Sequence, residues 1–288
     1  MKIEKVSVVV PVYNEEEAIA DDLRTIVKAM EGSGRDYEVI VVNDASTDGT
    51  AEVVAAFPGV QLITHRQNRG GGFSRNTGIR AATGDVFVVT DGDGTYPNQD
   101  IPKLLDAMEA EDLDMVVGAR KKESGTLKLI RGPVKWFIRK LAEVMSGFKI
   151  PDLNSGLRAM KKDVFMKYMD ILPWGHSWVS TITLAMLADG LQVDFVPIDY
   201  YQRKGKSTFH PIKDTSSYLT LVIRTVTWFN PLKVFMPVAL LLGGLGLFWL
   251  IYDIVRWDVR TATVLLLLAA IQVAAIGLLA DLISKRGR

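Results

Sequence analysis

The sequence predicts an α/β domain with a mostly parallel, doubly wound sheet, followed by a hairpin of two membrane-spanning helices. Two observations predict this fold class. Short valine-rich runs alternate with segments of helical periodicity in the first part of the chain, as in a parallel sheet with helices on both faces. Two long uncharged apolar stretches lie near the end, and the 288 residues suffice for one sizeable domain with such an appendage.

The expected strands are short apolar runs bounded by turn-forming residues. Ser7–Val12 is continuous and rich in valine, as in a parallel strand that is buried on both faces. Later runs of the same character are Glu38–Val42, Val60–Thr64, Val86–Thr90 and Met115–Val117. In sheets of this kind ligands bind beyond the carboxyl ends of the strands, so we expect the functional residues there.

The expected helices lie between these strands. Apolar residues recur at helical spacing from Ala18 to Met30, and Asn14 is expected to cap this helix, with three glutamates in its first turn. Further helices are expected at Asn76–Ala82 and Ile101–Glu109. Each of the expected helices joins two expected strands, which supports the doubly wound arrangement.

The two apolar stretches are Phe235–Tyr252 and Val264–Ala280, and neither carries a charge. Each is near the lower limit of the roughly 17–25 residues that cross a bilayer. Trp249, Tyr252 and Trp257 lie where an aromatic belt is expected, and the short connection predicts a hairpin with both chain ends on one side. The basic tail predicts that this side is cytoplasmic. The alternative is a pair of buried helices in a soluble core.

Charge is divided unevenly along the chain. Residues 1–119 hold 21 acidic and 10 basic side chains, whereas the remainder holds 12 acidic and 24 basic. The acidic first part argues against nucleic-acid binding, and the basic remainder suits anionic lipid headgroups. Residues 120–149 carry nine basic side chains beside one apolar helical side, which predicts either an interface helix or a surface helix packed on the domain. The absence of cysteine excludes disulfides and cysteine metal sites.

The motif Asp91-Gly92-Asp93 directly follows the expected strand Val86–Thr90. Two carboxylates at one strand end can hold a hard divalent cation such as Mg²⁺ or Mn²⁺, which also binds substrate phosphates. The motif alone is weak evidence because Asp and Gly are common in turns, and its place at a strand end strengthens it. Asp44 ends the second expected strand, where its carboxylate can accept a hydrogen bond from a nucleobase N–H.

Three consecutive glycines at 70–72 precede an expected helix. Backbone N–H groups in such a loop can cradle phosphate, although the Gly-Lys-Ser/Thr ending of a Walker A loop is missing. The alternative is a glycine-permitted mobile loop. Arg75 and Asn76 follow the glycines and are candidates for contact with a ligand.

Six strings together carry a resemblance to a known family. They are V-V-V-P-V-Y-N-E (8–15), V-V-N-D-A-S-T-D-G-T (41–50), N-R-G-G-G-F-S-R-N-T-G (68–78), G-D-V-F-V-V-T-D-G-D (84–93), V-V-G-A-R (116–120) and D-L-N-S-G-L-R (152–158). The chain resembles the family 2 glycosyltransferases of the GT-A fold over residues 5–230. Within that family it is most similar to the dolichol-phosphate mannose synthases and the bacterial polyprenyl-phosphate glycosyltransferases.

The resemblance implies roles for individual residues. The implied nucleotide pocket comprises Pro11, Tyr13, Glu15, Val42, Asp44 and Gly92. The implied catalytic set, of which the first two members bind the metal and the diphosphate, comprises Asp91, Asp93, Arg120 and Arg203. The implied contacts of the acceptor phosphate are Arg131, Ser155, Arg158, Lys206 and Ser207. Thr95 stands where mannose synthases carry glutamine, so the donor stays open between uridine and guanosine nucleotides.

The resemblance implies an inverting, metal-dependent enzyme that transfers a sugar from a nucleotide-sugar to a polyprenyl or dolichyl phosphate. The expected cofactor is Mg²⁺ or Mn²⁺, and the expected place is the cytoplasmic face of the cell membrane, as a monomer or a homo-oligomer. The implied domains are a nucleotide-sugar-binding core at 1–125, an acceptor-side region with interface helices at 126–231, and two transmembrane helices at 232–288. The alternatives are another lipid acceptor, a glycan acceptor, or an inactive membrane scaffold.

Overall fold

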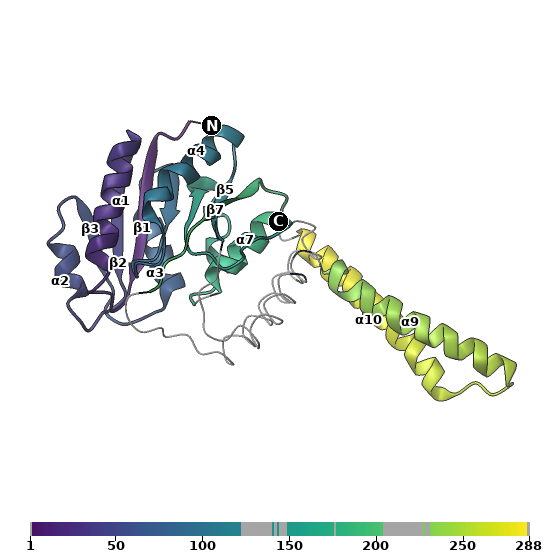
Figure 1. Ribbon diagram of the computed structural model, residues 1–288. Coiled ribbons are helices and arrows are strands. Elements are labelled where there is room, and N and C mark those ends of the chain that lie inside the picture. Colours follow the sequence, from purple (N-terminus) through teal and green to yellow (C-terminus); the bar gives the residue numbers. More distant parts are fainter. Residues whose placement is uncertain are drawn as a thin grey trace.

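The computed structural model describes residues 2–121, 140, 143, 149–175, 177–203, 227 and 231–286. An α/β domain is followed by a long helical hairpin that projects away from it (Figure 1). The expected interface helix within 120–149 falls mostly outside the described residues. Arg131, Lys206 and Ser207 also lie outside them.

The domain is built on a seven-stranded sheet with the order β3-β2-β1-β4-β6-β5-β7. The strands are β1 (Lys5–Val12), β2 (Asp36–Asn43), β3 (Val60–Thr64), β4 (Val86–Val89), β5 (Met115–Arg120), β6 (Arg158–Lys161) and β7 (Val193–Ile198). All neighbouring strands pair parallel except β6, which runs antiparallel to both β4 and β5. The predicted mostly parallel sheet is confirmed, and the valine-rich strands are buried on both faces as expected.

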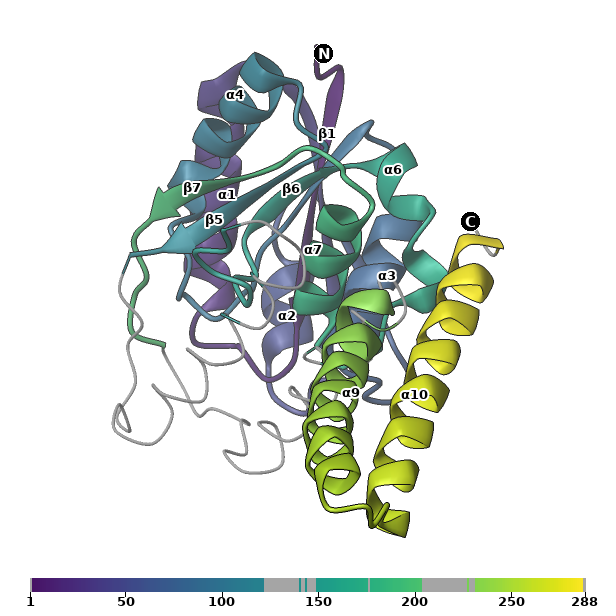
Figure 2. The same cartoon turned by 90° about the vertical axis from the view of Figure 1, so that its right-hand side faces the viewer.

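Helices cover both faces of this sheet (Figure 2). One apolar core lies beneath α1 (Ile19–Ser33), α2 (Thr50–Ala55) and α4 (Ile101–Glu111). A second core lies on the opposite face beneath α3 (Gly71–Ala81), α6 (Lys162–Met166) and α7 (Trp178–Ala188). The short 3₁₀ helices are η1 (Asn98–Asp100) and η2 (Met169–Ile171). The doubly wound arrangement is therefore confirmed.

Asn14 does not cap the first helix, which corrects the prediction. Its backbone is left-handed, with φ 57°, and its side-chain oxygen accepts a hydrogen bond from the backbone N–H of Thr47. Helix α1 begins at Ile19, after a turn in which the N–H groups of Ala18 and Ile19 donate to the carbonyl of Glu15. Asparagine also favours the left-handed conformation, and Asn14 adopts it where its side chain bonds to the loop after β2.

Helix α3 begins at Gly71, within the glycine run and five residues before the start that periodicity predicts. Glycine is needed there because a Cβ on Gly72 would lie 2.6 Å from the carbonyl oxygen of Pro173. The backbone N–H of Phe73 donates to the carbonyl of Trp174 at 3.1 Å. The glycines therefore allow the start of α3 to contact the loop that precedes α7.

Helix α3 also approaches β1 closely, at Gly78. We expect Gly78→Ala to destabilise the domain by about 1–3 kcal/mol through overpacking, because the added Cβ would lie 2.4 Å from Cγ1 of Val9. The matched control is Gly32→Ala in α1, where no atom lies within 4 Å and the change is expected to be neutral or stabilising. Chemical denaturation of both variants measures the difference, and equal stability of Gly78→Ala and wild type would contradict this packing.

The hairpin consists of α9 (Leu232–Val255) and α10 (Thr261–Arg286). The spans have mean hydropathies of 2.3 and 2.5, and both are long and apolar enough to cross a membrane. Large apolar side chains along them face outward, for example Leu241 and Phe248, each 64% exposed. This exposure contradicts the alternative of two buried helices in a soluble core. Both ends of the hairpin lie on the side of the α/β domain, and its turn lies at the far end (Figure 1).

Side-chain contacts hold the hairpin together and join it to the domain. The two helices approach closely at Gly246, where a Cβ would lie 2.7 Å from Leu267, and their turn is closed by Asp253, which accepts hydrogen bonds from Arg260 and Thr263. At the other end, Val234 packs on an apolar cluster of the domain that includes Leu187. The hairpin therefore starts directly from the α/β domain.

Candidate active site

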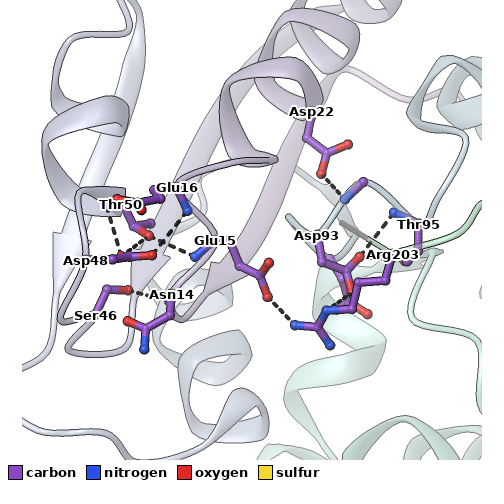
Figure 3. A network of polar contacts seen from close by, with 12 residues as sticks. Asn14, Glu15, Glu16, Asp22, Ser46, Asp48, Thr50, Asp93, Thr95 and Arg203 are labelled. Atoms are coloured by element: carbon purple, nitrogen blue, oxygen red, sulfur yellow. Dashed lines mark hydrogen bonds and ion pairs between the residues drawn. The ribbon is translucent and has the colours of Figure 1, made fainter. Parts of the chain in front are cut away.

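Polar residues gather where several strands of the sheet have their carboxyl ends. Tyr13 follows β1, Asp44 follows β2, and Asp91 and Asp93 follow β4. Arg203 comes from the segment after β7 and meets this edge from a distant part of the chain (Figure 3). The strands β1, β2 and β4 run parallel, so their carboxyl ends lie at the same edge of the sheet. Segments that are far apart in sequence therefore meet at this edge.

Asp91 and Asp93 are each in contact with an arginine. Oδ1 of Asp91 accepts a hydrogen bond from Arg75 at 2.7 Å, and Oδ2 of Asp93 lies 3.5 Å from Nε of Arg203. Oδ1 of Asp93 also accepts hydrogen bonds from the backbone N–H and hydroxyl of Thr95, at 3.2 and 2.5 Å. Burial raises the pKa of Asp93, and the negative charge of Asp91 raises it further. The pair is therefore an electronegative site that favours added positive charge.

Arg203 also donates a hydrogen bond to Oε1 of Glu15 (Figure 3). Burial raises the pKa of Glu15 to about 7, an effect that the charge of Arg203 opposes and the charge of Asp93 reinforces. One guanidinium thus lies between two carboxylates from different loops. The structure therefore brings together Glu15, which the resemblance implies for the nucleotide pocket, and Asp93 and Arg203, which it implies for the catalytic set.

The two motif carboxylates fit a hard divalent cation. No cluster of three or more metal-ligating side chains occurs in the part of the chain that the structure describes, so Asp91 and Asp93 would together supply two carboxylate groups. Mg²⁺ and Mn²⁺ suit such a site because they prefer oxygen and complete their coordination with water and substrate phosphates. Burial and then the charge of Asp91 raise the pKa of Asp93, and a bound cation would favour its ionised form.

The loop 154–156 lies directly against Asp91. The backbone N–H of Gly156 donates to the hydroxyl of Tyr96 at 2.6 Å, and a Cβ at Gly156 would lie 2.7 Å from Oδ2 of Asp91. Ser155 is fully buried, and its hydroxyl has no hydrogen-bond partner among the described residues. The expected contact of Ser155 with the acceptor phosphate stays a prediction.

Arg158 does not face the site as an accessible phosphate ligand, which corrects the expectation. The residue is 0% exposed and donates to the carbonyl of Val179 and the hydroxyl of Thr183, both at 2.9 Å, and also to the carbonyl of Ser155. Burial and the nearby charge of Arg75 together lower its pKa to about 10. Arg158 starts the antiparallel strand β6, and its side chain braces the loop 154–156 against α7.

Arg120 has a carboxylate partner that sequence reasoning missed. Its Nε and Nη2 donate to the two carboxylate oxygens of Asp152 at 2.6 and 2.9 Å, and its guanidinium lies 5.1 Å from the ring centroid of Tyr200. Although burial opposes ionisation, the hydrogen bonds and charge of Arg120 lower the pKa of Asp152. The role of Arg120 as a phosphate ligand stays a prediction.

Asp44 organises the glycine loop. Its carboxylate accepts from the backbone N–H groups of Arg69 and Gly70, at 3.0 and 2.7 Å, and lies 2.7 Å from Nδ1 of His65. His65 in turn lies 3.0 Å from the hydroxyl of Thr77. The sequence signal for this network is that Asp44 and His65 each directly follow a strand, because β2 and β3 pair parallel with Asn43 opposite Thr64 and their carboxyl ends lie side by side. The expected nucleobase contact of Asp44 stays a prediction.

The other residues expected in the nucleotide pocket differ in the solvent exposure of their side chains. Tyr13 is exposed at the edge of the sheet, and Pro11 lies in β1 opposite Val42 of β2. Val42 is fully buried, and its side chain packs toward α3 beside Ile40. Gly92 packs on β1 and α1, where a Cβ would lie 2.7 Å from Val12. The expected contact of Val42 with the nucleoside stays a prediction.

Models of two known protein families match the two parts of the chain. The sequence model of Glycosyl transferase family 2 matches residues 7–169, and the model of the GtrB C-terminal hairpin matches residues 230–285. The dodecaprenyl-phosphate galacturonate synthase of Rhizobium johnstonii is 25% identical over 98% of this chain and 88% of that protein. The prophage bactoprenol glucosyl transferase homolog of Escherichia coli is 28% identical over 98% of this chain and 94% of that protein.

A solved structure shows the same fold. The glucosyl-3-phosphoglycerate synthase of Mycobacterium tuberculosis, in complex with Mn²⁺, uridine-diphosphate-glucose and phosphoglyceric acid, superposes with a TM-score of 0.61. The match covers 77% of this chain and 80% of that one at 18% identity, so it bears on the fold alone. The predicted GT-A fold is confirmed. Because the family model matches more than half of its length, the chain is a glycosyltransferase and belongs to Glycosyl transferase family 2.

Proposed function

We propose that this glycosyltransferase transfers a sugar from a uridine- or guanosine-linked nucleotide-sugar to a polyprenyl phosphate, with a divalent cation and with inversion at the anomeric carbon. The observation that carries the proposal is the pair Asp91 and Asp93, flanked by Arg75 and Arg203, in a domain continuous with an outward-facing apolar hairpin. The names of two full-length relatives, a dodecaprenyl-phosphate galacturonate synthase and a bactoprenol glucosyl transferase homolog, support a lipid acceptor.

The donor end of the reaction is assigned to the motif carboxylates and their arginines. Asp91 and Asp93 would hold Mg²⁺ or Mn²⁺, and the cation supplies positive charge that stabilises the nucleoside diphosphate as it leaves. The guanidinium groups of Arg75 and Arg203 lie beside these carboxylates. Each guanidinium is planar and permanently charged, and its N–H groups can donate to two oxygens of a diphosphate. Both arginines are thereby available to compensate charge that develops in the reaction.

The acceptor end requires little acid–base chemistry. A phosphate monoester has a second pKa near 6, so a polyprenyl phosphate is already largely a dianion at neutral pH and serves directly as the nucleophile. One of its oxygens bonds to the anomeric carbon from the face opposite the leaving group, and the bond to the diphosphate breaks with its electron pair. Ser155 is proposed to donate its buried hydroxyl to the acceptor phosphate, together with Arg120. Arg131, Lys206 and Ser207 keep the same proposed role.

The hairpin is proposed to place this site at headgroup level. Two spans joined by a short turn put both ends of the hairpin, and with them the catalytic domain, on one side of the bilayer. The basic C-terminal tail, S-K-R-G-R, favours the cytoplasmic side. The protein is therefore proposed to be a two-span membrane enzyme with its catalytic domain in the cytoplasm.

The test is a transfer assay with the purified full-length chain. Uridine- and guanosine-linked sugars are offered with undecaprenyl phosphate in detergent, with Mn²⁺, with Mg²⁺ and with a chelator. We expect labelled sugar in the lipid fraction with one nucleotide class, and loss of this transfer on chelation. Transfer to a soluble glycan instead of the lipid, transfer unaffected by the chelator, or no transfer from any donor would contradict the proposal.

A further inference from the structure

A buried carboxylate on α1 lies directly beneath the turn that carries the motif aspartates. Asp22 is 6% exposed and lies on the same helical face as the apolar residues Ile19, Leu23 and Ile26. A carboxylate on such a face is costly unless its oxygens accept hydrogen bonds. Burial raises the pKa of Asp22 to about 7, which reflects this cost, and the N–H of Gly94 opposes the rise.

Asp22 connects the two ends of the turn. Its Oδ2 accepts from the backbone N–H of Gly94 at 2.8 Å, immediately after Asp93 (Figure 3). Its Oδ1 accepts from the side-chain amide of Asn98 at 2.9 Å. The carbonyl oxygen of Asn98 accepts in turn from the hydroxyl of Thr90 at 2.6 Å, immediately before Asp91. A closed series of three hydrogen bonds therefore encloses Asp91-Gly92-Asp93.

The same helix also supports the middle of the turn. A Cβ at Gly92 would lie 2.9 Å from Cδ1 of Ile19, so the backbone of the turn rests on α1 one helical turn before Asp22. Gly94 has φ 73°, a conformation that glycine adopts without steric cost. Ile19 and Asp22 thus contact the turn on both sides of Asp93, at Gly92 and Gly94, where the chain has no regular secondary structure of its own.

We propose that Asp22 is a positioning residue: through Gly94 and Asn98 it holds Asp91 and Asp93 at the separation that binds a divalent cation and a diphosphate. This inference rests on the proposed function. Asp22 touches neither ligand itself, and it acts by restricting the turn. Partners of this kind, which orient metal ligands without binding the metal, typically contribute about 10- to 100-fold to metal affinity.

The donor and acceptor pattern in the structure suits a carboxylate at this position. The carbonyl oxygen of Asn98 accepts from Thr90 and its amide group donates to Asp22, and the other neighbour of Asp22 is also an N–H donor. Asp22→Asn would therefore place an amide donor against one of two donors. Exchanging the residues, as Asp22→Asn with Asn98→Asp, restores every bond: residue 22 accepts from Gly94 and donates to residue 98, which still accepts from Thr90.

The experiment measures Mn²⁺ binding by electron paramagnetic resonance, with uridine diphosphate or guanosine diphosphate present, in the full-length protein. Asp22→Asn is expected to weaken Mn²⁺ binding about 10- to 100-fold and to alter the spectrum of the bound ion. The double exchange is expected to restore both. The matched control is Asp21→Asn, which removes an exposed carboxylate from the neighbouring position of α1 and is expected to leave both unchanged. Thermal unfolding without metal reports whether each variant is folded.

Each outcome decides one question. If the wild type binds no Mn²⁺ with either nucleotide, the proposed function fails. If the wild type binds and Asp22→Asn binds equally well, or if the double exchange stays as weak as the single variant, the positioning role of Asp22 is overturned. Should Asp22→Asn not fold, Asn98→Ala tests the same series of bonds, and wild-type Mn²⁺ affinity in that variant would overturn the inference.

Discussion

Replacing Asp93 with asparagine is expected to lower sugar transfer by at least about 100-fold without unfolding the protein, since residues that merely orient metal ligands already contribute 10- to 100-fold. Asparagine has nearly the same shape, and its carbonyl oxygen can still accept both hydrogen bonds from Thr95. What it lacks is the negative charge and the second oxygen ligand that a divalent cation requires. The loss should therefore fall on metal-dependent binding of the donor.

The stability of the same variant should be unchanged or higher. Burial and the charge of Asp91 raise the pKa of Asp93, so ionised Asp93 destabilises the native state at any pH above the ordinary pKa of aspartate. Removing the charge removes this cost, and the melting temperature at pH 8 should equal or exceed that of the wild type. Asp170→Asn is the control, because that side chain is 95% exposed and remote from the motif in sequence. Full activity of Asp93→Asn, or a lower melting temperature, would contradict the assignment.

Replacing Asp152 with asparagine is expected to destabilise the domain by about 3–5 kcal/mol, because breaking a buried ion pair leaves a charge without its counter-ion. Arg120 and Asp152 are both largely buried, and the guanidinium of Arg120 donates two hydrogen bonds to the carboxylate. A change of this size should lower the melting temperature by roughly 10 °C. The matched control is Asp199→Asn, whose ion pair with Lys121 is exposed and is expected to contribute less than about 1 kcal/mol.

The effect of Asp152→Asn should depend on pH in a defined direction. Arg120 lowers the pKa of Asp152 in the folded state below the unfolded value, so the ion pair contributes its full stability above about pH 5. That contribution is lost as the pH falls below about 4 and through the lowered pKa of the folded state. Melting temperatures of wild type and variant should differ by a constant amount from pH 8 to pH 5 and converge in acid. A difference that does not decrease at all between pH 5 and pH 3 would contradict the ion-pair explanation.

Much of the fold follows from local patterns in the chain. The parallel strands are continuous apolar runs because both of their faces are covered, and periodicity located β1 to β5 within a few residues of their ends. The hairpin was equally clear, because two long apolar runs without a charge are typical of membrane-spanning helices. By contrast, β6, α7 and β7 were not predicted. Strand β6 begins with a buried arginine and has only four residues, so it lacks the apolar pattern of a strand.

The sequence by itself determined the family, the doubly wound sheet, the Asp91-Gly92-Asp93 motif at a strand end and the apolar hairpin, because each is marked by residue types that are close together in the chain. Only the tertiary structure decided which charges meet. Arg203 reaches Glu15 across 188 positions, Arg120 binds Asp152, and Asp22 holds the turn of Asp93. The tertiary structure also shows that the side chain of Arg158 is buried in the core and is not exposed at the site. Hydrogen-bond partners are chosen by distance and direction after the sheet has formed, and neither quantity is encoded in the spacing of residues along the chain.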